Sequence, residues 1–267
     1  MTELDDIMRN PVSRRSFITR MSAAGLGAAA LSLVAAGCGG GGGNSTPVTP
    51  FADSANFPGI RGATEDEVVL NYALTLEILE ADLYRQALNL ASGRDLTTPL
   101  NPDSSTYPAS ASISSGGLDA GSAAAGYLYL KQYAAVEAAH RDFLKAAILA
   151  NGFTPVMPNP HGYTAPFGSD LKSILTLLRN VEETGVRAYL GAAGYLSTLG
   201  LIQTAATIYS TEARHSSALN YVLGLDTGPQ PMPGDNKVTP NYPHPNTFEY
   251  YLTPTQVLTQ VAPFFVS

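Results

Sequence analysis

Apolar residues recur every three or four positions in four long segments of this 267-residue chain. This spacing predicts amphipathic helices, because residues three and four apart lie on one helical face. No segment longer than a few residues alternates between apolar and polar positions, as a half-buried strand would. The pattern therefore predicts an all-α fold whose helices cover residues 64–90, 123–150, 169–193 and 201–223.

Local signals mark several helix ends. The first helix opens with Thr64-Glu65-Asp66-Glu67, which has the pattern of a capping box with acidic residues in the first turn. Asn151-Gly152 stops the second helix, and Gly224 follows the fourth. After a Pro-rich stretch, residues 253–265 predict a short apolar helix that docks on the others as a strap.

Two connections are too long to be simple turns between neighbouring helices. Residues 93–121 are rich in Ser, Pro, Gly and Thr and predict an excursion over the surface. Residues 152–168 include four prolines. Extended at roughly 3.3 Å per residue, the second connection could reach over about 50 Å, so it can carry the chain along the length of a helix bundle.

The second and fourth helices each carry a histidine three residues after a glutamate. The pairs are Glu137 with His140 and Glu212 with His215. Each pair lies within the apolar stripe of its helix, where a carboxylate costs several kcal/mol unless something neutralises it. A divalent metal ion is one such neutraliser, so both pairs are candidate metal ligands.

The first and third helices each carry a single glutamate in their apolar stripe. Glu77 and Glu182 lie among apolar residues, and each is followed seven residues later by a tyrosine, Tyr84 or Tyr189. Seven residues are two helical turns, so each tyrosine lies on the face of its glutamate. The tyrosines are candidates for hydrogen bonds to ligand carboxylates, and a plain role as core aromatics is the alternative.

One Glu from each of two helices, with Glu-x-x-His from each of two others, resembles the carboxylate-bridged dinuclear site of ferritin-like proteins. The chain is similar to ferritins, rubrerythrins and manganese catalases, and most similar to the ferritin-like proteins associated with bacterial stress and plant desiccation. The resemblance covers about residues 65–224. It implies a four-helix bundle with a long crossover between helices two and three, and two iron or two manganese ions held by Glu77, Glu137, His140, Glu182, Glu212 and His215.

Glu80 complicates the assignment of the ligand on the first helix. It lies one turn after Glu77 on nearly the same face, so it is an alternative or additional metal ligand. Glu77 is favoured because only Glu77 has the seven-residue spacing to a tyrosine. Gly185, which is unusual inside a helix, either leaves room beside the site or serves close helix packing. His161 and His244 lie in Pro-rich segments and are expected to be solvated.

Oxygen and nitrogen ligands together suit iron or manganese. The resemblance implies an oxidoreductase that acts on dioxygen or peroxide. One alternative is a non-catalytic metal-sequestering or structural protein of desiccation or stress, and another is a scaffold whose site is empty. A closed storage cage is disfavoured, because the N-terminal tether and the excursion at 93–121 would interfere with a shell.

The N-terminus has the features of an export signal. Ser13-Arg14-Arg15-Ser16-Phe17-Ile18 and the Ala, Gly and Leu stretch that follows resemble a twin-arginine signal, with an ordinary secretory signal as the alternative. Ala35-Ala36-Gly37-Cys38 before five glycines resembles a lipoprotein cleavage site, although Leu is usual at the position of Ala35. Lipidation at Cys38, the only cysteine, would be the sole attachment to a membrane; the alternative is an inert residue of a discarded signal.

These features divide the chain into four parts. They are an export signal at 1–37, a flexible tether at 38–62, the helix bundle at 63–225 and a Pro-rich C-terminal extension with a short helix at 226–267. The expected location is the periplasm or the cell envelope.

The charge of the mature part excludes one class of partner. Residues 1–37 hold four of the 15 basic and three of the 22 acidic residues, so the remainder carries 11 basic and 19 acidic residues, a net charge near −8. Such a chain is not expected to bind nucleic acid. The expected partners are metal ions with dioxygen or peroxide, and a second copy of the chain stays open as a partner.

Overall fold

The computed structural model describes residues 56–229 and 249–267. The export signal, Cys38, most of the tether and His244 lie outside these ranges. Within them the chain forms helices and no β-strand, which confirms the predicted all-α class.

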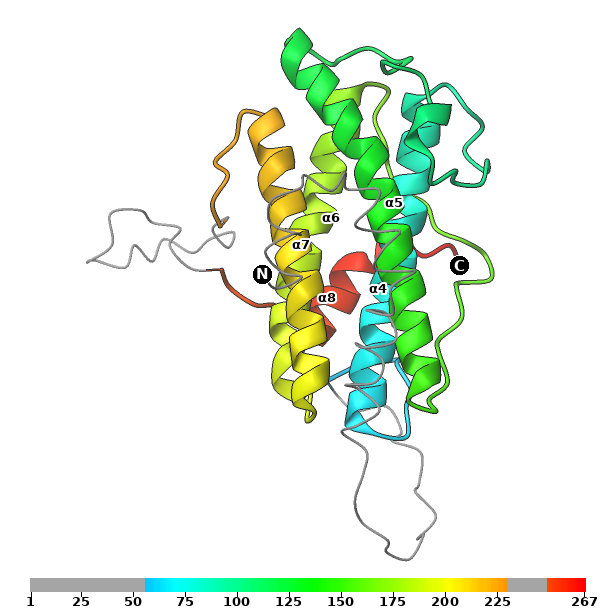
Figure 1. Cartoon of the computed structure of the whole chain (residues 1–267), viewed down its shortest axis with the longest axis vertical. Helices are drawn as coiled ribbons and strands as arrows, with labels where there is room; N and C mark the ends of the chain where they lie inside the picture. Colours follow the sequence, from blue (N-terminus) through cyan, green and yellow to red (C-terminus); the bar gives the residue numbers. More distant parts are fainter. Residues whose placement is uncertain (1–55, 230–248) are drawn as a thin grey trace, which may run out of the picture. The chain divides into compact units, whose positions relative to one another are not determined.

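Four long helices form the bundle, and Figure 1 shows them side by side. Helices α4 and α7 run upward in that view, whereas α5 and α6 run downward. The second and third helices of the bundle are therefore parallel, which requires a long crossover between them. The helices are α4 (Glu65–Ala91), α5 (Ala120–Ala150), α6 (Leu171–Ala192) and α7 (Leu199–Val222).

Side chains at the N-termini explain where the helices begin. Thr64 accepts a hydrogen bond from the backbone of Glu67, as expected of the first half of a capping box. The second half is absent, because the Glu67 carboxylate accepts instead from the backbone N–H groups of Ala63 at 2.6 Å and Thr154 at 2.9 Å. Asp119 caps α5 and moves its start three residues before the predicted one.

The crossover runs along α4 for most of that helix. Near the start of α4, Asn71 Oδ1 accepts from the backbone N–H of Val156 at 2.9 Å. Near its end, Gln86 Nε2 donates to the carbonyl of Tyr163 at 2.9 Å. From Asn71 to Gln86 a helix rises roughly 22 Å at 1.5 Å per residue. The predicted long crossover is thus confirmed, and it covers one side of α4.

The long connection between α4 and α5 packs onto the end of the bundle. It contains one 3₁₀ turn, Ser104–Thr106, and the buried ring of Tyr107. Its Ser114 carbonyl accepts from the backbone N–H of Leu171 at 2.9 Å, where α6 begins. This excursion therefore also fixes the start of the third bundle helix.

The C-terminal segment lies against α6. Helix α8 (Pro254–Val261) begins with a complete capping box between Thr253 and Gln256, and the 3₁₀ turn η3 (Ala262–Phe264) follows it. Gln260 Nε2 donates to Thr184 Oγ1 at 2.9 Å. Gly191 permits the close approach, because a Cβ there would lie 1.9 Å from the carbonyl oxygen of Leu252.

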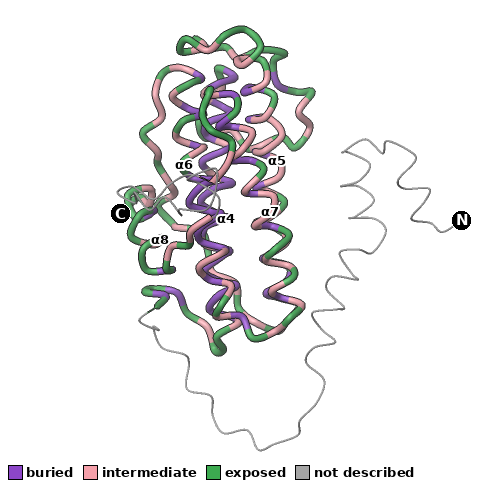
Figure 2. Tube along the Cα trace, turned by 90° about the vertical axis from the view of Figure 1, so that its left-hand side faces the viewer, coloured by how far each residue is buried: buried purple, intermediate pink, exposed green. Residues whose placement is uncertain are grey.

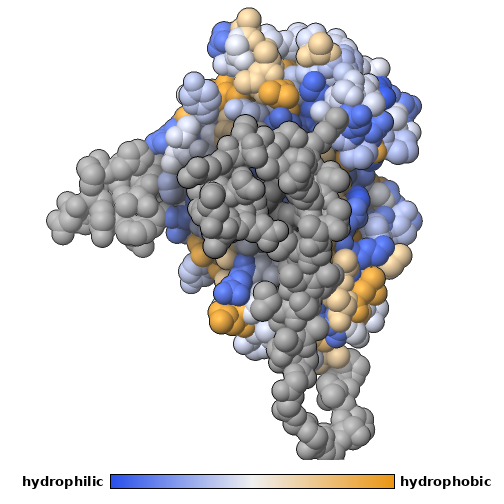
Figure 3. Space-filling model, viewed as in Figure 1, coloured by the Kyte–Doolittle hydropathy of each residue, from blue (hydrophilic) through white to orange (hydrophobic). Residues whose placement is uncertain are grey.

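Helix α4 is the most completely enclosed element, and Figure 2 shows it buried along most of its length. The crossover and the neighbouring helices cover its sides, so 21 of its 27 residues are buried. Glutamates on more than one face of α4 are consequently withdrawn from water. On the face shown in Figure 3, hydrophobic residues form small separate patches among hydrophilic ones. No helix in the described ranges is long and apolar enough to cross a membrane.

Candidate metal centre

Six side chains from the four bundle helices converge in the interior. Each of two overlapping groups offers ligand atoms that lie within 4.8 Å of one another. Both groups contain Glu137 and Glu212, so these two carboxylates lie between two adjacent positions for an ion. The first group is Glu77, Glu137, His140 and Glu212, and the second is Glu137, Glu182, Glu212 and His215.

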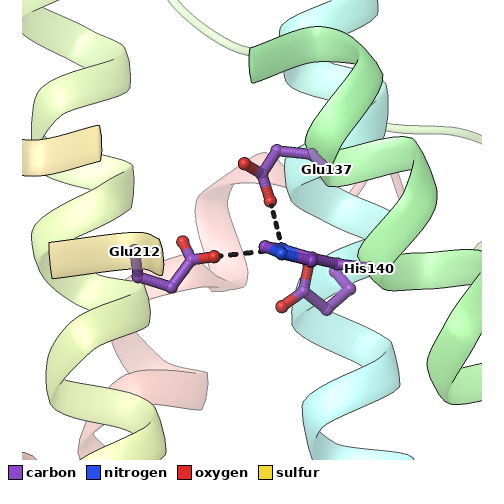
Figure 4. A group of neighbouring side chains, drawn as sticks. Glu137, His140 and Glu212 are labelled. Carbon is purple, nitrogen blue, oxygen red and sulfur yellow. Dashed lines mark hydrogen bonds and ion pairs between the residues drawn. The ribbon is translucent and has the colours of Figure 1, made fainter. Parts of the chain in front are cut away.

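The carboxylate of Glu137 lies between the two imidazoles. Its Oε2 is 3.0 Å from Nδ1 of His140, and its Oε1 is 2.9 Å from Nδ1 of His215. Figure 4 shows that Glu212 reaches the same histidine from the opposite helix, with Oε1 3.2 Å from Nδ1 of His140. One oxygen of Glu137 therefore faces each imidazole, the arrangement that a bridging carboxylate requires.

The two remaining glutamates lie at opposite ends of the cluster. Glu77 Oε2 is 3.5 Å from Nδ1 of His140, and Glu182 Oε2 is 3.4 Å from Nδ1 of His215. Glu77 therefore belongs with His140 and Glu182 with His215. The internal repeat of the sequence becomes an approximate two-fold arrangement of ligands around the shared carboxylates.

The two tyrosines hold the outer oxygens of these end glutamates. Tyr189 donates from its hydroxyl to Glu77 Oε1 at 2.6 Å, and Tyr84 donates to Glu182 Oε1. Each tyrosine thus serves the glutamate of the other helix rather than its own. Burial raises the pKa of both phenols, so both remain protonated donors. Each end glutamate is held by one oxygen while the other faces its histidine.

The cluster contains polar atoms that the protein itself does not satisfy. All four glutamates are at most 1% exposed. Among the described residues, six buried ligand atoms make no hydrogen bond, although Glu137 Oε1 and His215 Nδ1 lie 2.9 Å apart: Glu77 Oε2, Glu137 Oε1, Glu182 Oε2, both carboxylate oxygens of Glu212, and His215 Nδ1. An unsatisfied buried polar atom costs about 1–3 kcal/mol, and more when it is charged. A pair of cations coordinated by these atoms would remove that cost, so the residues fit two metal ions with mixed oxygen and nitrogen ligands.

The pKa values of the cluster reflect burial and crowding. Burial raises the pKa of Glu77 to about 7, and burial with repulsion from Glu137 raises that of Glu212 well above its ordinary range. Burial also acts to raise the pKa of Glu137, but contacts with His140 and His215 outweigh it and lower the pKa to about 2. Against the opposing effect of burial, Glu137 raises the pKa of the His140 imidazole, and Glu182 with Glu137 raises that of His215. Without cations the cluster therefore holds protons, which an arriving metal ion must displace.

Glu80 belongs to neither ligand group, although its side chain is buried, with 4% exposed, and lies near the cluster. A Cβ added to Gly185 would lie 3.0 Å from Glu80 Oε1 and 3.2 Å from Glu212 Oε2. Gly185 therefore leaves room beside the carboxylates, which was one of its two expected roles. The structure brings Glu77, rather than Glu80, to the histidine as the α4 member of the cluster.

Two further residues lie close to the cluster without belonging to the ligand groups. The ring of Tyr133 stacks on the imidazole of His215, with centroids 3.7 Å apart, and limits its rotation. Its position four residues before Glu137 puts it on the same helical face, but the pattern does not show which imidazole it contacts. Glu183 is also buried and pairs with Arg187 at 2.7 Å, away from the ligand groups. His161 is exposed, as expected.

The chain matches the family described as ferritin-like domain over residues 65–225, which is more than half of its length. The matched range contains all four bundle helices and all six clustered side chains. No curated protein matches the chain.

Proposed function

Since the chain belongs to the ferritin-like domain family, we propose that it is an exported protein that binds two iron or two manganese ions and uses them in redox chemistry on dioxygen or peroxide during envelope stress. The observation that carries the proposal is the pair of overlapping ligand groups, in which five buried carboxylate oxygens lack a hydrogen-bond partner. When bound, the ions supply reversible changes of oxidation state that no side chain of the cluster offers.

The residues divide into shared and separate ligands. Glu137 and Glu212 would bridge the two ions, because both belong to each group. Glu77 with His140 would complete one position, and Glu182 with His215 the other. Four carboxylates would offset the four positive charges of two divalent ions.

The surrounding protein prepares the site in two ways. The tyrosine hydroxyls fix the end carboxylates before any ion arrives, which reduces the reorganisation that binding requires. Burial of the glutamates excludes bulk water, so charge interactions within the site are strong. Protons held on Glu77 and Glu212 in the metal-free protein would leave when ions bind.

The same burial favours a second candidate function. Ligands that are almost wholly enclosed release an ion slowly, which suits a non-catalytic protein that sequesters metal or stabilises the envelope during desiccation. Turnover separates the two functions, because only the redox enzyme consumes dioxygen or peroxide beyond one equivalent of its metal.

Export remains part of the proposal. It is supported by the paired arginines of Ser13-Arg14-Arg15-Ser16-Phe17-Ile18 and by the apolar stretch that follows them. Attachment to the membrane through a lipid on Cys38 is supported by the small residues that precede it.

The test is metal analysis of the exported protein, followed by assays of dioxygen and peroxide consumption. We expect two iron or manganese ions per chain, and loss of most of this metal in His140→Ala and in His215→Ala. His161→Ala is the control, because this histidine is exposed in the crossover and should leave the metal content unchanged. Two ions retained in His140→Ala would contradict the assignment of the site, whereas bound metal without turnover would favour sequestration.

A further inference from the structure

A pocket of about 230 Å³ lies between α4, α6 and the C-terminal segment. Asn180 and Gln260 are exposed where the pocket meets solvent, whereas Glu80 and Gly185 are buried. The intervening walls are mostly apolar and come from three parts of the chain: Leu76 and Leu79 on α4, Leu177 and Val181 on α6, and Val261 and Phe264 at the C-terminus.

The buried end of the pocket adjoins the ligand carboxylates. Gly185 lines the pocket, and the space where its Cβ would stand is 3.0 Å from Glu80 Oε1 and 3.2 Å from Glu212 Oε2. The second oxygen of Glu80 is buried and lacks a hydrogen-bond partner. Because residue 185 is a glycine, it places no side chain between the pocket and the carboxylate of Glu212.

The lining favours one class of ligand. A cation would have to leave its hydration shell among aliphatic and aromatic side chains before it met the first carboxylate, which is costly. A small uncharged molecule loses little hydration free energy when it enters a pocket with such walls. Apolar cavities of about 150 Å³ accept xenon and benzene, so this pocket has room for a diatomic gas.

We propose that the pocket beneath α8 is the route by which dioxygen reaches the metal centre. The inference rests on the proposed function and adds to it the identity of the oxidant and its path. Metal ions are expected to use another approach, and His140, whose side chain is 14% exposed, is the most exposed member of the cluster. The C-terminal segment is then part of the active protein, because it forms one wall of the route.

The test uses the full chain with variants at the mouth of the pocket. Gln260→Trp should obstruct the mouth, and the exposed position can accept a large side chain without disturbing the core. Thr259→Trp is the matched control, because the neighbouring residue is exposed on the same helix and does not line the pocket. Gln260→Ala removes the hydrogen bond to Thr184 without adding bulk, so it separates obstruction from loss of that contact.

A second pair of variants enlarges the route. Phe264→Ala should widen the pocket, whereas Phe265→Ala removes a ring that packs on Tyr163 with centroids 5.1 Å apart and lies outside the pocket lining. Comparing these adjacent substitutions controls for general loosening of the C-terminus.

Two measurements decide the matter. Crystals under xenon pressure should show xenon in the pocket of the wild type and none in Gln260→Trp, a result that needs no metal. In stopped-flow mixing, iron(II)-loaded Gln260→Trp should react with dioxygen about tenfold more slowly, equivalent to about 1.4 kcal/mol in the barrier. Thr259→Trp, Gln260→Ala and Phe265→Ala should keep the wild-type rate, and Phe264→Ala should equal or exceed it. Iron(II) uptake should be equal in all variants.

The possible failures are distinguishable. Absence of xenon from the wild-type pocket, or an unchanged dioxygen rate in a Gln260→Trp variant that binds iron normally, would overturn the route while leaving the metal site intact. An equal slowing of the reaction with peroxide would overturn the assignment to an apolar ligand. Failure to bind either iron or manganese would refute the proposed function first, and the route would fall with it.

Discussion

Removal of a single hydroxyl, by Tyr189→Phe, is the sharpest test of how the protein prepares its metal site. The Tyr189 hydroxyl donates to Glu77 Oε1 at 2.6 Å, and both groups are buried. Phe keeps the ring and its packing, so the variant removes the hydrogen bond alone. It leaves Glu77 with both oxygens unsatisfied, because Oε2 already lacks a partner within the protein.

The magnitude follows from the kind of bond that is lost. A hydrogen bond to a charged group contributes about 1.5–3 kcal/mol. Loss of a group that orients a metal ligand typically lowers metal affinity about 10- to 100-fold, or about 1.4–2.7 kcal/mol. We therefore expect the affinity for the ion beside Glu77 to fall by this factor, while the second ion, beside Glu182, is affected less.

The control is the same substitution elsewhere in the bundle. Tyr127 is also buried, and its hydroxyl lies 2.9 Å from Ser92 Oγ, outside both ligand groups. Tyr127→Phe should lower the stability of the fold without changing metal affinity. Competition with a chromogenic chelator measures affinity, and thermal unfolding with and without metal measures the coupling. If Tyr189→Phe bound both ions as tightly as Tyr127→Phe, the hydroxyl would have no part in preparing the site.

Three further outcomes are expected. The free energy of unfolding of the metal-free protein should fall as the pH rises from 4.5 to about 7, because burial raises the pKa of Glu77 and the folded chain keeps protons that the unfolded chain has released; urea titrations at several pH values would refute this if the profile were flat or rising. Arg187→Ala should destabilise the fold by about 3–5 kcal/mol, since it deprives the buried Glu183 of its ion pair, and a loss below about 1 kcal/mol in urea unfolding would argue against that role. Arg14→Lys with Arg15→Lys should block export, as measured by fractionation, whereas continued export would indicate the general secretory route.

The helices could be predicted because their apolar periodicity is long and regular, but their ends depended on single side chains. The start of α5 lies three residues before the predicted one, because Asp119 accepts hydrogen bonds from the backbone of Gly121 and Ser122. The capping box predicted at Thr64 was only half correct, because Glu67 does not accept a hydrogen bond from the backbone of Thr64. The crossover returns Thr154 to the beginning of α4, where it takes up the carboxylate of Glu67. Such a contact joins residues far apart in the sequence, which local patterns do not describe.

The candidate ligands could be identified because a carboxylate in an apolar stripe is anomalous wherever it occurs. The pairing of tyrosines with glutamates could not be predicted, since the spacing suggests that Tyr84 belongs with Glu77. The direction of the helices decides otherwise. Helices α4 and α6 run in opposite directions, so a tyrosine two turns beyond its own glutamate reaches back to the glutamate of the other helix. The burial of Glu183 could not be predicted either, because its partner Arg187 is covered by a segment from far along the chain, where Glu249 Oε1 lies 3.5 Å from Arg187 Nε.

Glu80 and Gly185 break the two-fold pattern of the site. Gly185 follows Glu182 by three residues, as Glu80 follows Glu77, so the two occupy equivalent positions on α6 and α4. The carboxylate of Glu80 lies where a side chain at position 185 would otherwise stand. Burial raises the pKa of Glu80 well above its ordinary range, and repulsion from Glu212 and Glu77 adds to the shift. The fifth carboxylate and the pocket therefore lie on one side of an otherwise symmetric cluster, so two ions bound there would be chemically inequivalent.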